Sequence, residues 1–178
     1  KGQSIKSISE NIDKEPFDVT AVLIKYSNNS VQMVGFGMNE KEIETILSHP
    51  RVMIASDAGA HAPYPPMNKS IAHPRAYGTF PRAIAKYVKE RKICSLEEMV
   101  RKMTGLPAEK FRLKDRGLIQ ENKAADIVIF DYDKIKDKAE FTDSMQYPEG
   151  INFVIVNGKV VIENGEHTGE LPGKIIRF

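Results

Sequence analysis

The chain has 178 residues, of which 41% are hydrophobic, and carries 26 lysines and arginines against 24 aspartates and glutamates. A net charge of +2 gives no electrostatic reason to expect nucleic acid or an acidic membrane as a partner. A membrane-spanning helix needs about 20 apolar residues, and the apolar runs of this sequence are far shorter. The single cysteine excludes an internal disulfide framework, and residues 1–10 lack the apolar region of a secretory signal. The sequence therefore predicts a cytoplasmic protein.

Three helices are expected in the first fifty residues. Residues 4–12 space their isoleucines as one face of an amphipathic helix, and Pro16 suits the first turn of a second helix over residues 17–26. Asn39 and Glu42 form a capping box that opens a third helix, which ends near Ser48.

Two apolar stretches in the same region are typical of strands. They are residues 31–36 and residues 52–55, and the second is an unbroken apolar run of the kind buried on both faces. Helices and strands that alternate through short links favour a parallel α/β sheet.

Residues 56–81 contain five prolines and neither helical nor strand periodicity. Loops longer than about 12–15 residues inside a compact domain are usually functional or disordered. This one follows the carboxyl end of an expected parallel strand, where α/β folds bind their ligands. The loop therefore indicates a functional site.

The second half of the chain changes in character. Helices are expected over residues 82–91 and, from the capping box of Ser95 and Glu98, up to Met103, with a short helical turn from Pro107. Beyond about residue 112 the pattern is mostly β.

Three strands are expected in this second part. Residues 126–131 form one, and residues 151–156 and 159–162 form a hairpin across Asn157-Gly158, the strongest short signal for a two-residue type I′ turn.

Asp57, at the start of the proline-rich loop, and Arg75, within it, are the candidate functional side chains. Asp57 is either an ordinary turn aspartate leaving a strand or a rigidly held general base. Arg75 is either a solvated loop charge or a planar fork that binds a carboxylate with two hydrogen bonds. The residues alone leave both alternatives open.

No self-contained metal site is visible in the sequence. It has no H-x-H, H-E-x-x-H or C-x-x-C motif, and no phosphate-binding glycine loop or G-x-S-x-G nucleophile elbow. His49 is interpreted as a residue at a helix end and His167 as a surface residue.

A family resemblance extends over nearly the whole chain. The run His-Pro-Arg-Ala-Tyr-Gly-Thr-Phe-Pro-Arg at residues 73–82 resembles the N-acyl-D-amino-acid deacylases (D-aminoacylases) of the amidohydrolase superfamily. Further stretches match the family, in its order, on either side of this run: residues 55–57, 95–108, 115–119, 125–131, 156–158 and 165–169.

The resemblance implies a fold. These enzymes have a metal-dependent (β/α)8 TIM-like barrel and a small β-sandwich, and a complete barrel takes about 250 residues. Residues 1–112 would be the last βα units of the barrel, with residues 31–36 and 52–55 as strands seven and eight. Residues 113–178 would be the C-terminal part of the sandwich. The family's other metal ligands would lie upstream, so the chain is expected to be the C-terminal portion of a longer deacylase.

The resemblance also implies roles. Asp57 would be the metal-site aspartate that takes a proton from zinc-bound water and delivers it to the departing amine. Arg75 would hold the substrate carboxylate, with His73 as a further substrate-binding residue. The substrate would be an N-acyl-D-amino acid, the cofactor Zn²⁺, and the partner the missing N-terminal part of the barrel. The isolated chain is expected to be inactive.

Two alternatives remain open. One is another amidohydrolase, of the dihydroorotase or hydantoinase type, that acts on cyclic amides. The other is a non-catalytic binding or assembly module derived from the barrel.

Overall fold

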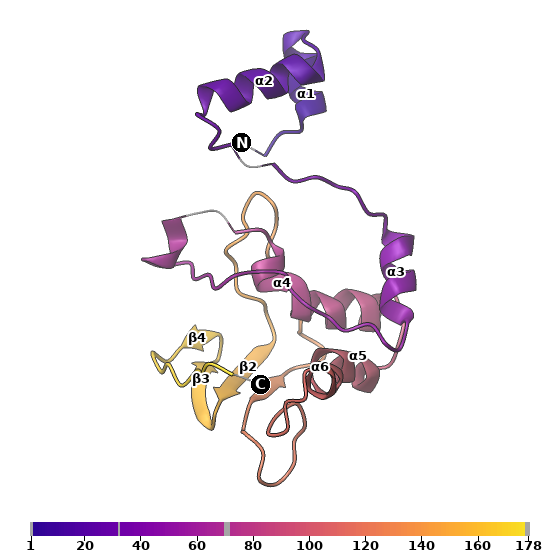
Figure 1. Cartoon of the computed structure of the whole chain (residues 1–178), viewed down its shortest axis with the longest axis vertical. Helices are drawn as coiled ribbons and strands as arrows, with labels where there is room; N and C mark the ends of the chain where they lie inside the picture. Colours follow the sequence, from indigo (N-terminus) through magenta and orange to yellow (C-terminus); the bar gives the residue numbers. More distant parts are fainter. Residues whose placement is uncertain (1, 32, 70–71, 177–178) are drawn as a thin grey trace. The chain divides into compact units, whose positions relative to one another are not determined.

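The computed structural model describes residues 2–31, 33–69 and 72–176. The chain divides into two units, one up to Asn39 and one from Glu40 onward. Helices dominate the chain up to α6 (Gly105–Lys110), and the strands follow it (Figure 1). No helix in the three described ranges is long and apolar enough to cross a membrane.

The first unit contains a pair of helices. α1 (Ile5–Ile12) begins after Ser4, whose hydroxyl accepts a 3.0 Å hydrogen bond from a backbone N–H of the first turn. α2 (Pro16–Tyr26) begins with its proline at the first helical position. The two helices contact each other, and Val19 of α2 is buried. Both predicted helices are confirmed.

The strand predicted over residues 31–36 is wrong for the residues that the structure describes, and Gln32 lies outside them. Val31 and residues 33–36 are extended but belong to no strand, and Met33 and Phe36 are about four-fifths exposed. A strand persists where a neighbouring strand satisfies its backbone N–H and C=O groups. The described part of this unit contains no such neighbour.

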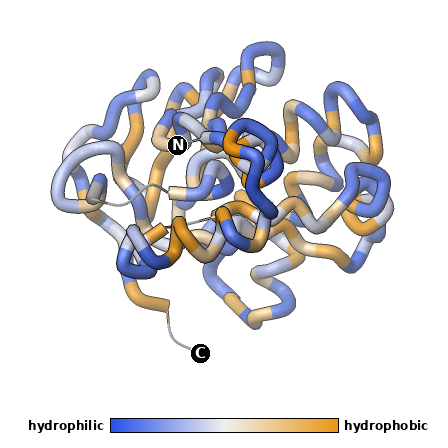
Figure 2. The backbone as a smooth tube through the Cα atoms, turned by 90° about the horizontal axis from the view of Figure 1, so that it is seen from above, coloured by the Kyte–Doolittle hydropathy of each residue, from blue (hydrophilic) through white to orange (hydrophobic). Residues whose placement is uncertain are grey.

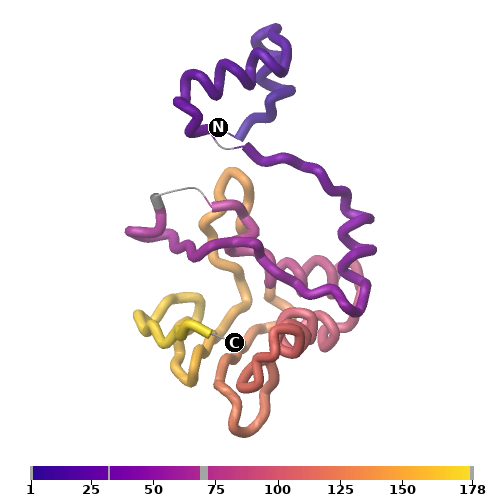
Figure 3. The backbone as a smooth tube through the Cα atoms, viewed as in Figure 1, coloured from indigo at the N-terminus to yellow at the C-terminus, as the bar shows by residue number. Residues whose placement is uncertain are grey.

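The second unit holds the remaining helices and the sheet. Figure 3 follows the chain through them in order, from the helices to the strands. The helical elements are α3 (Glu40–Ser48), the short η1 (Met67–Lys69), α4 (Arg75–Arg82), η2 (Ala83–Glu90), α5 (Leu96–Met103) and α6 (Gly105–Lys110).

The core of this unit lies between η2 and α5. Tyr87, Val88 and Met99 are buried there, and partly buried side chains of α3 pack against them, including Leu47. Hydrophobic residues recur between hydrophilic ones along the helical turns (Figure 2), which is the pattern of helices that bury one face. Burial of that face holds α3, η2 and α5 together.

α5 begins where its capping box predicts. The hydroxyl of Ser95 accepts a 3.2 Å hydrogen bond from the backbone N–H of Glu98, and the helix runs from Leu96 to Met103.

The loop predicted over residues 56–81 ends earlier than expected, because α4 begins at Arg75. Pro81 lies inside the helix and lacks the N–H that would bond the preceding turn. The helix continues beyond it through η2, whose turns are of the wider π type. The sequence placed Pro81 at the end of the loop and predicted the next helix from residue 82, and that start was wrong.

The strand predicted over residues 52–55 is also absent. These residues are extended without a ladder, and the N–H of Ile54 donates a 3.2 Å hydrogen bond to the carbonyl of Lys102 in α5. The described residues therefore contain no parallel sheet, contrary to the prediction.

The sheet is antiparallel, with the order β1-β2-β3-β4. Its strands are β1 (Ile127–Phe130), β2 (Ile151–Val156), β3 (Lys159–Glu163) and β4 (Glu166–His167). Asn157 and Gly158 have φ angles of 47° and 81°, as a type I′ turn requires. The predicted strand and hairpin are confirmed. Taken together, the chain is an α/β structure with a small antiparallel sheet.

Candidate functional site

Asp57 lies at the end of the extended segment that follows α3. Its φ of 49° is left-handed, a conformation that aspartate tolerates better than most residues. Its side chain is 85% exposed. The carboxylate therefore projects from a defined backbone position and is open to a ligand.

The structure brings Asp57 and Arg75 together. A terminal guanidinium nitrogen of Arg75 lies 2.9 Å from Oδ2 of Asp57, and the Arg75 side chain is 45% exposed. Asp57, near the start of the predicted loop, and Arg75, 18 residues further along it, thus meet as an ion pair.

Arg75 is positioned by the start of α4. Its backbone N–H donates a 3.1 Å hydrogen bond to Nδ1 of His73, so the imidazole satisfies one of the N–H groups left free at a helix start. The hydroxyl of Thr79 donates to the Arg75 carbonyl at 2.8 Å. The first turn of α4 is therefore tied down on both sides of Arg75.

The imidazole of His73 is held by a second contact. Its ring meets the ring of Phe141 edge-to-face, with 5.2 Å between the centroids. Burial and then the charge of Arg75 lower the pKa of His73 below its ordinary value. A neutral ring is the form that keeps Nδ1 as an acceptor for the Arg75 N–H.

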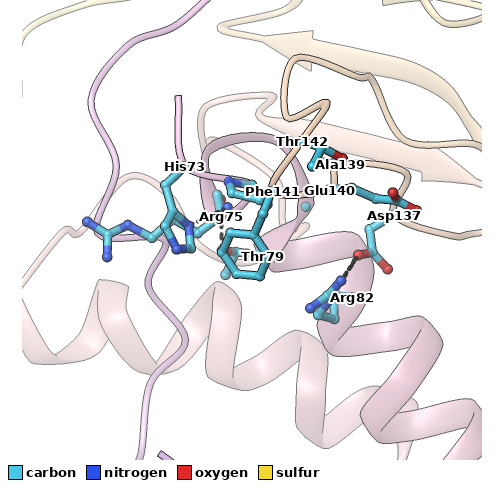
Figure 4. Close-up of a pocket in the computed structure, with 11 residues that line it drawn as sticks. His73, Arg75, Thr79, Arg82, Asp137, Ala139, Glu140, Phe141 and Thr142 are labelled. Carbon is cyan, nitrogen blue, oxygen red and sulfur yellow. Dashed lines mark hydrogen bonds and ion pairs between the residues drawn. The ribbon is translucent and has the colours of Figure 1, made fainter. Parts of the chain in front are cut away.

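A cavity of about 420 Å³ lies beside this helix start. It is lined by residues of α4 and its approach and by a segment between β1 and β2: His73, Pro74, Arg75, Gly78, Thr79, Arg82, Asp137, Ala139, Glu140, Phe141 and Thr142. Figure 4 shows the rings of His73 and Phe141 close together and Arg82 reaching toward Asp137.

Two contacts hold the cavity-lining segment between β1 and β2 against α4. Nε of Arg82 donates a 2.7 Å hydrogen bond to Oδ2 of Asp137. Gly78 faces the same aspartate so closely that an added Cβ would lie 3.3 Å from its Cβ. Sequence reasoning missed Asp137 and Phe141, because nothing local in the sequence indicates which distant helix a loop residue will contact.

The other singled-out histidines do not join the site. Nδ1 of His49 accepts from the N–H of Arg51 just beyond α3, and Nδ1 of exposed His167 accepts from the N–H of Gly169. Across the described residues there is no group of three or more histidine, cysteine, aspartate or glutamate side chains that could hold a metal ion. Asp57 offers one carboxylate.

A model of the amidohydrolase family matches residues 28–162 of the chain. The chain belongs to this family.

The amidohydrolase relatives include deacylases. The chain is 38% identical over 142 residues to the N-acyl-D-aspartate deacylase of Alcaligenes xylosoxydans xylosoxydans, covering 79% of this chain and 27% of that protein. It is 33% identical over 175 residues to the D-aminoacylase of the same organism, covering 98% and 34%. A dihydroorotase of Lactobacillus acidophilus is 36% identical over 97 residues, covering 48% and 23%. The resemblance to D-aminoacylases is confirmed.

Solved structures give the same picture. A D-aminoacylase crystal structure matches with a TM-score of 0.76 at 34% identity, over 96% of this amidohydrolase chain and 33% of that one. An N-acyl-D-glutamate deacylase from Bordetella bronchiseptica, complexed with zinc and a phosphonate inhibitor that mimics the tetrahedral intermediate, matches with a TM-score of 0.73 at 31% identity, over 90% and 31%. The chain spans between about a quarter and a third of the length of the relatives it matches.

Proposed function

We propose that this chain is the C-terminal part of a zinc-dependent hydrolase that cleaves the amide of N-acyl-D-amino acids to a carboxylate and a free D-amino acid. The observation that carries the proposal is the 2.9 Å approach of Asp57 and Arg75 at an exposed position. A proton acceptor and an anion-binding fork side by side are what hydrolysis of an amide next to a carboxylate requires. The deacylase relatives supply the reaction class.

Asp57 is proposed as the general base and acid. Its carboxylate would accept a proton from the attacking water and deliver it to the amine nitrogen as the amide C–N bond breaks. Because the side chain is largely exposed, both water and substrate can reach it.

Arg75 is proposed to hold the substrate carboxylate, with His73 as a further substrate-binding residue. An ion pair exposed to solvent contributes only about 0–1 kcal/mol, so the Asp57–Arg75 pair opens at little cost. The freed guanidinium can then bind a planar carboxylate through two hydrogen bonds. His73 fixes the backbone of Arg75 and lines the adjacent cavity.

Zinc does not fit the described residues on their own. A catalytic zinc takes about three protein ligands, and Asp57 provides one carboxylate without two companions among the described residues. Asp57 is therefore proposed to contribute to a zinc centre whose other ligands come from an N-terminal part of the barrel. In this proposal residues 1–112 belong to the barrel and residues 113–178 to the sandwich, and the enzyme acts in the cytoplasm.

The first test uses the chain by itself. The purified 178-residue chain, supplied with zinc, should not hydrolyse N-acetyl-D-aspartate, N-acetyl-D-glutamate or N-acetyl-D-leucine. Zinc-dependent turnover by this chain would contradict the assignment of the remaining ligands to another part of the protein.

The second test uses the full-length protein. Asp57→Asn should lower kcat by about 10²–10⁴-fold, because the amide keeps the shape of the carboxylate and its left-handed backbone but cannot take the proton. Arg75→Ala should mainly raise KM. Asp18→Asn in α2 and Arg51→Ala after α3 are the matched controls.

The outcomes separate the alternatives. Near wild-type kcat in Asp57→Asn would contradict the proton transfer. Turnover of dihydroorotate in preference to the N-acyl-D-amino acids would favour the cyclic-amide alternative. Absence of hydrolysis of either class by the full-length protein would favour a binding or assembly module.

A further inference from the structure

Lys102 is a charged residue in the core. It lies in α5, and its side chain has no exposed surface. Moving an ammonium group out of water costs several kcal/mol unless partners replace the lost hydration. A lysine in such a place needs a set of acceptors, and their identity indicates what the residue does.

The acceptors are backbone carbonyls of one short segment. Nζ of Lys102 donates to the carbonyls of Leu47 at 2.9 Å, of His49, and of Val52 at 3.4 Å. An ammonium group has three hydrogens, so these three carbonyls use all of its donors. A carboxylate oxygen of Glu98 lies 4.0 Å away and provides the opposite charge.

The first of these carbonyls belongs to the end of α3. The last carbonyls of a helix have no partner within it and carry the negative end of the helix dipole. The buried ammonium group donates a hydrogen bond to such a carbonyl and places a positive charge at the negative end of the dipole. It therefore fixes the residue at which α3 ends and the direction in which the chain continues.

Lys102 also holds the segment beyond that point. Its own carbonyl accepts the N–H of Ile54, so this residue contacts the backbone at four places between Leu47 and Ile54. Residues 52–55 have no strand partner in the described chain. Three residues after Ile54 comes Asp57.

We infer that Lys102 is a positioning residue for Asp57, holding the segment that carries the proposed general base from inside the core without touching substrate. The inference rests on the proposed function of Asp57. A side chain with no exposed surface cannot reach a ligand, so any effect of Lys102 on the reaction must pass through the backbone it binds. Arg75 receives its support from α4 and His73, and so lies outside this set of contacts.

The test is Lys102→Met in the full-length protein, which keeps an unbranched side chain that is one atom shorter and removes the donors. Per folded molecule, kcat for an N-acyl-D-amino acid should fall by about 10- to 100-fold, since small errors in placing a catalytic group have effects of that size. KM should stay within about twofold, because Arg75 is held independently.

Met99→Ala is the matched control. Met99 is equally buried in the same helix but does not contact the backbone of residues 47–54 through a hydrogen bond. It should lower stability while the folded molecules keep the wild-type kcat. An equal fall in kcat in both variants would overturn the positioning role, because it would show a general effect of loosening α5.

A double variant separates this inference from the proposed function. In the Asp57→Asn background, Lys102→Met should lower kcat no further, because the group it positions is already lost. If Asp57→Asn lowers kcat and Lys102→Met does not, the inference fails and the proposed function stands. If Asp57→Asn leaves kcat unchanged, the proposed function fails.

Should Lys102→Met not accumulate as a folded protein, Lys102→Arg takes its place. It keeps the charge and changes the donor geometry. A lower kcat with unchanged KM supports the inference, and a wild-type kcat overturns it.

Discussion

Asp57 and Arg75 meet at 2.9 Å, yet their backbones are held in different ways. Asp57 ends an extended segment fastened to the core through one buried lysine. Arg75 begins a helix whose start is fixed by His73, which also contacts Phe141, and whose last residue, Arg82, bonds Asp137. The segment of Asp57 therefore depends on the several contacts of one buried residue, whereas Arg75 depends on weaker contacts from several residues.

The largest expected effect concerns the buried face of α5, the helix whose Lys102 holds the segment that carries Asp57. Met99→Ala should lower the free energy of unfolding by about 2–5 kcal/mol, because the truncated methionine is fully buried and leaves a cavity. Urea unfolding of the purified chain measures it. Met103→Ala, at a partly buried position of the same helix, should lose less. Equal losses would show that the core is not concentrated at Met99.

A smaller effect is expected just before β2, at the end of the segment that carries Asp137 and Phe141. Gly150 has a φ of +80°, and a Cβ added there would lie 2.5 Å from the backbone nitrogen of Ile135. Gly150→Ala should lower stability by about 2 kcal/mol or more, from the left-handed backbone and the clash together. Gly158→Ala, at φ +81° with no atom near the new Cβ, should lose only the backbone part. Equal losses would rule out the close approach.

The smallest effect is a pH dependence at His73. Its pKa in the folded protein is lowered by burial and by Arg75, so the unfolded chain binds more protons just below the ordinary value of about 6.5. Its contribution to stability is therefore full above that pH and is lost as the pH falls. His73→Asn keeps an acceptor and removes the titration. Unfolding between pH 5 and 7 should show a flatter pH dependence in the variant, and parallel curves would contradict this.

Local signals predicted the parts of the fold that carry their own hydrogen-bond partners. Asn157-Gly158 identified the β2–β3 hairpin, because a two-residue turn fixes the pairing of the strands beside it. Ser95 and Glu98 identified the start of α5 for the same reason. In both cases the stabilising contact lies within a few residues of the signal.

Long-range contacts are what the sequence could not supply. Residues 31–36 and 52–55 look like strands, but a strand also needs a neighbour, and the described chain gives them none. Lys102 carries a signal that went unused: it lies three residues after Met99, so it falls on the apolar face of α5. A charge in that place indicates a buried partner, although not which one.

The candidate site was predictable in part. Asp57 and Arg75 were each ambiguous as single residues, and the family resemblance gave them roles. Their contact and the cavity wall formed by Asp137 and Phe141 depend on how the chain returns to α4, and no local pattern encodes that.

The pairing of Asp57 with Arg75 also bears on how an anion would arrive. Opposite charges 2.9 Å apart form a dipole, whose field falls off far faster than that of a free charge. Beyond a Debye length of about 8 Å, these two side chains would exert almost no pull on a distant carboxylate. Arg75 would therefore bind an anion that has already reached the site and would not raise the rate at which anions arrive. The loss of kcat/KM on replacing Arg75 should accordingly change little with ionic strength.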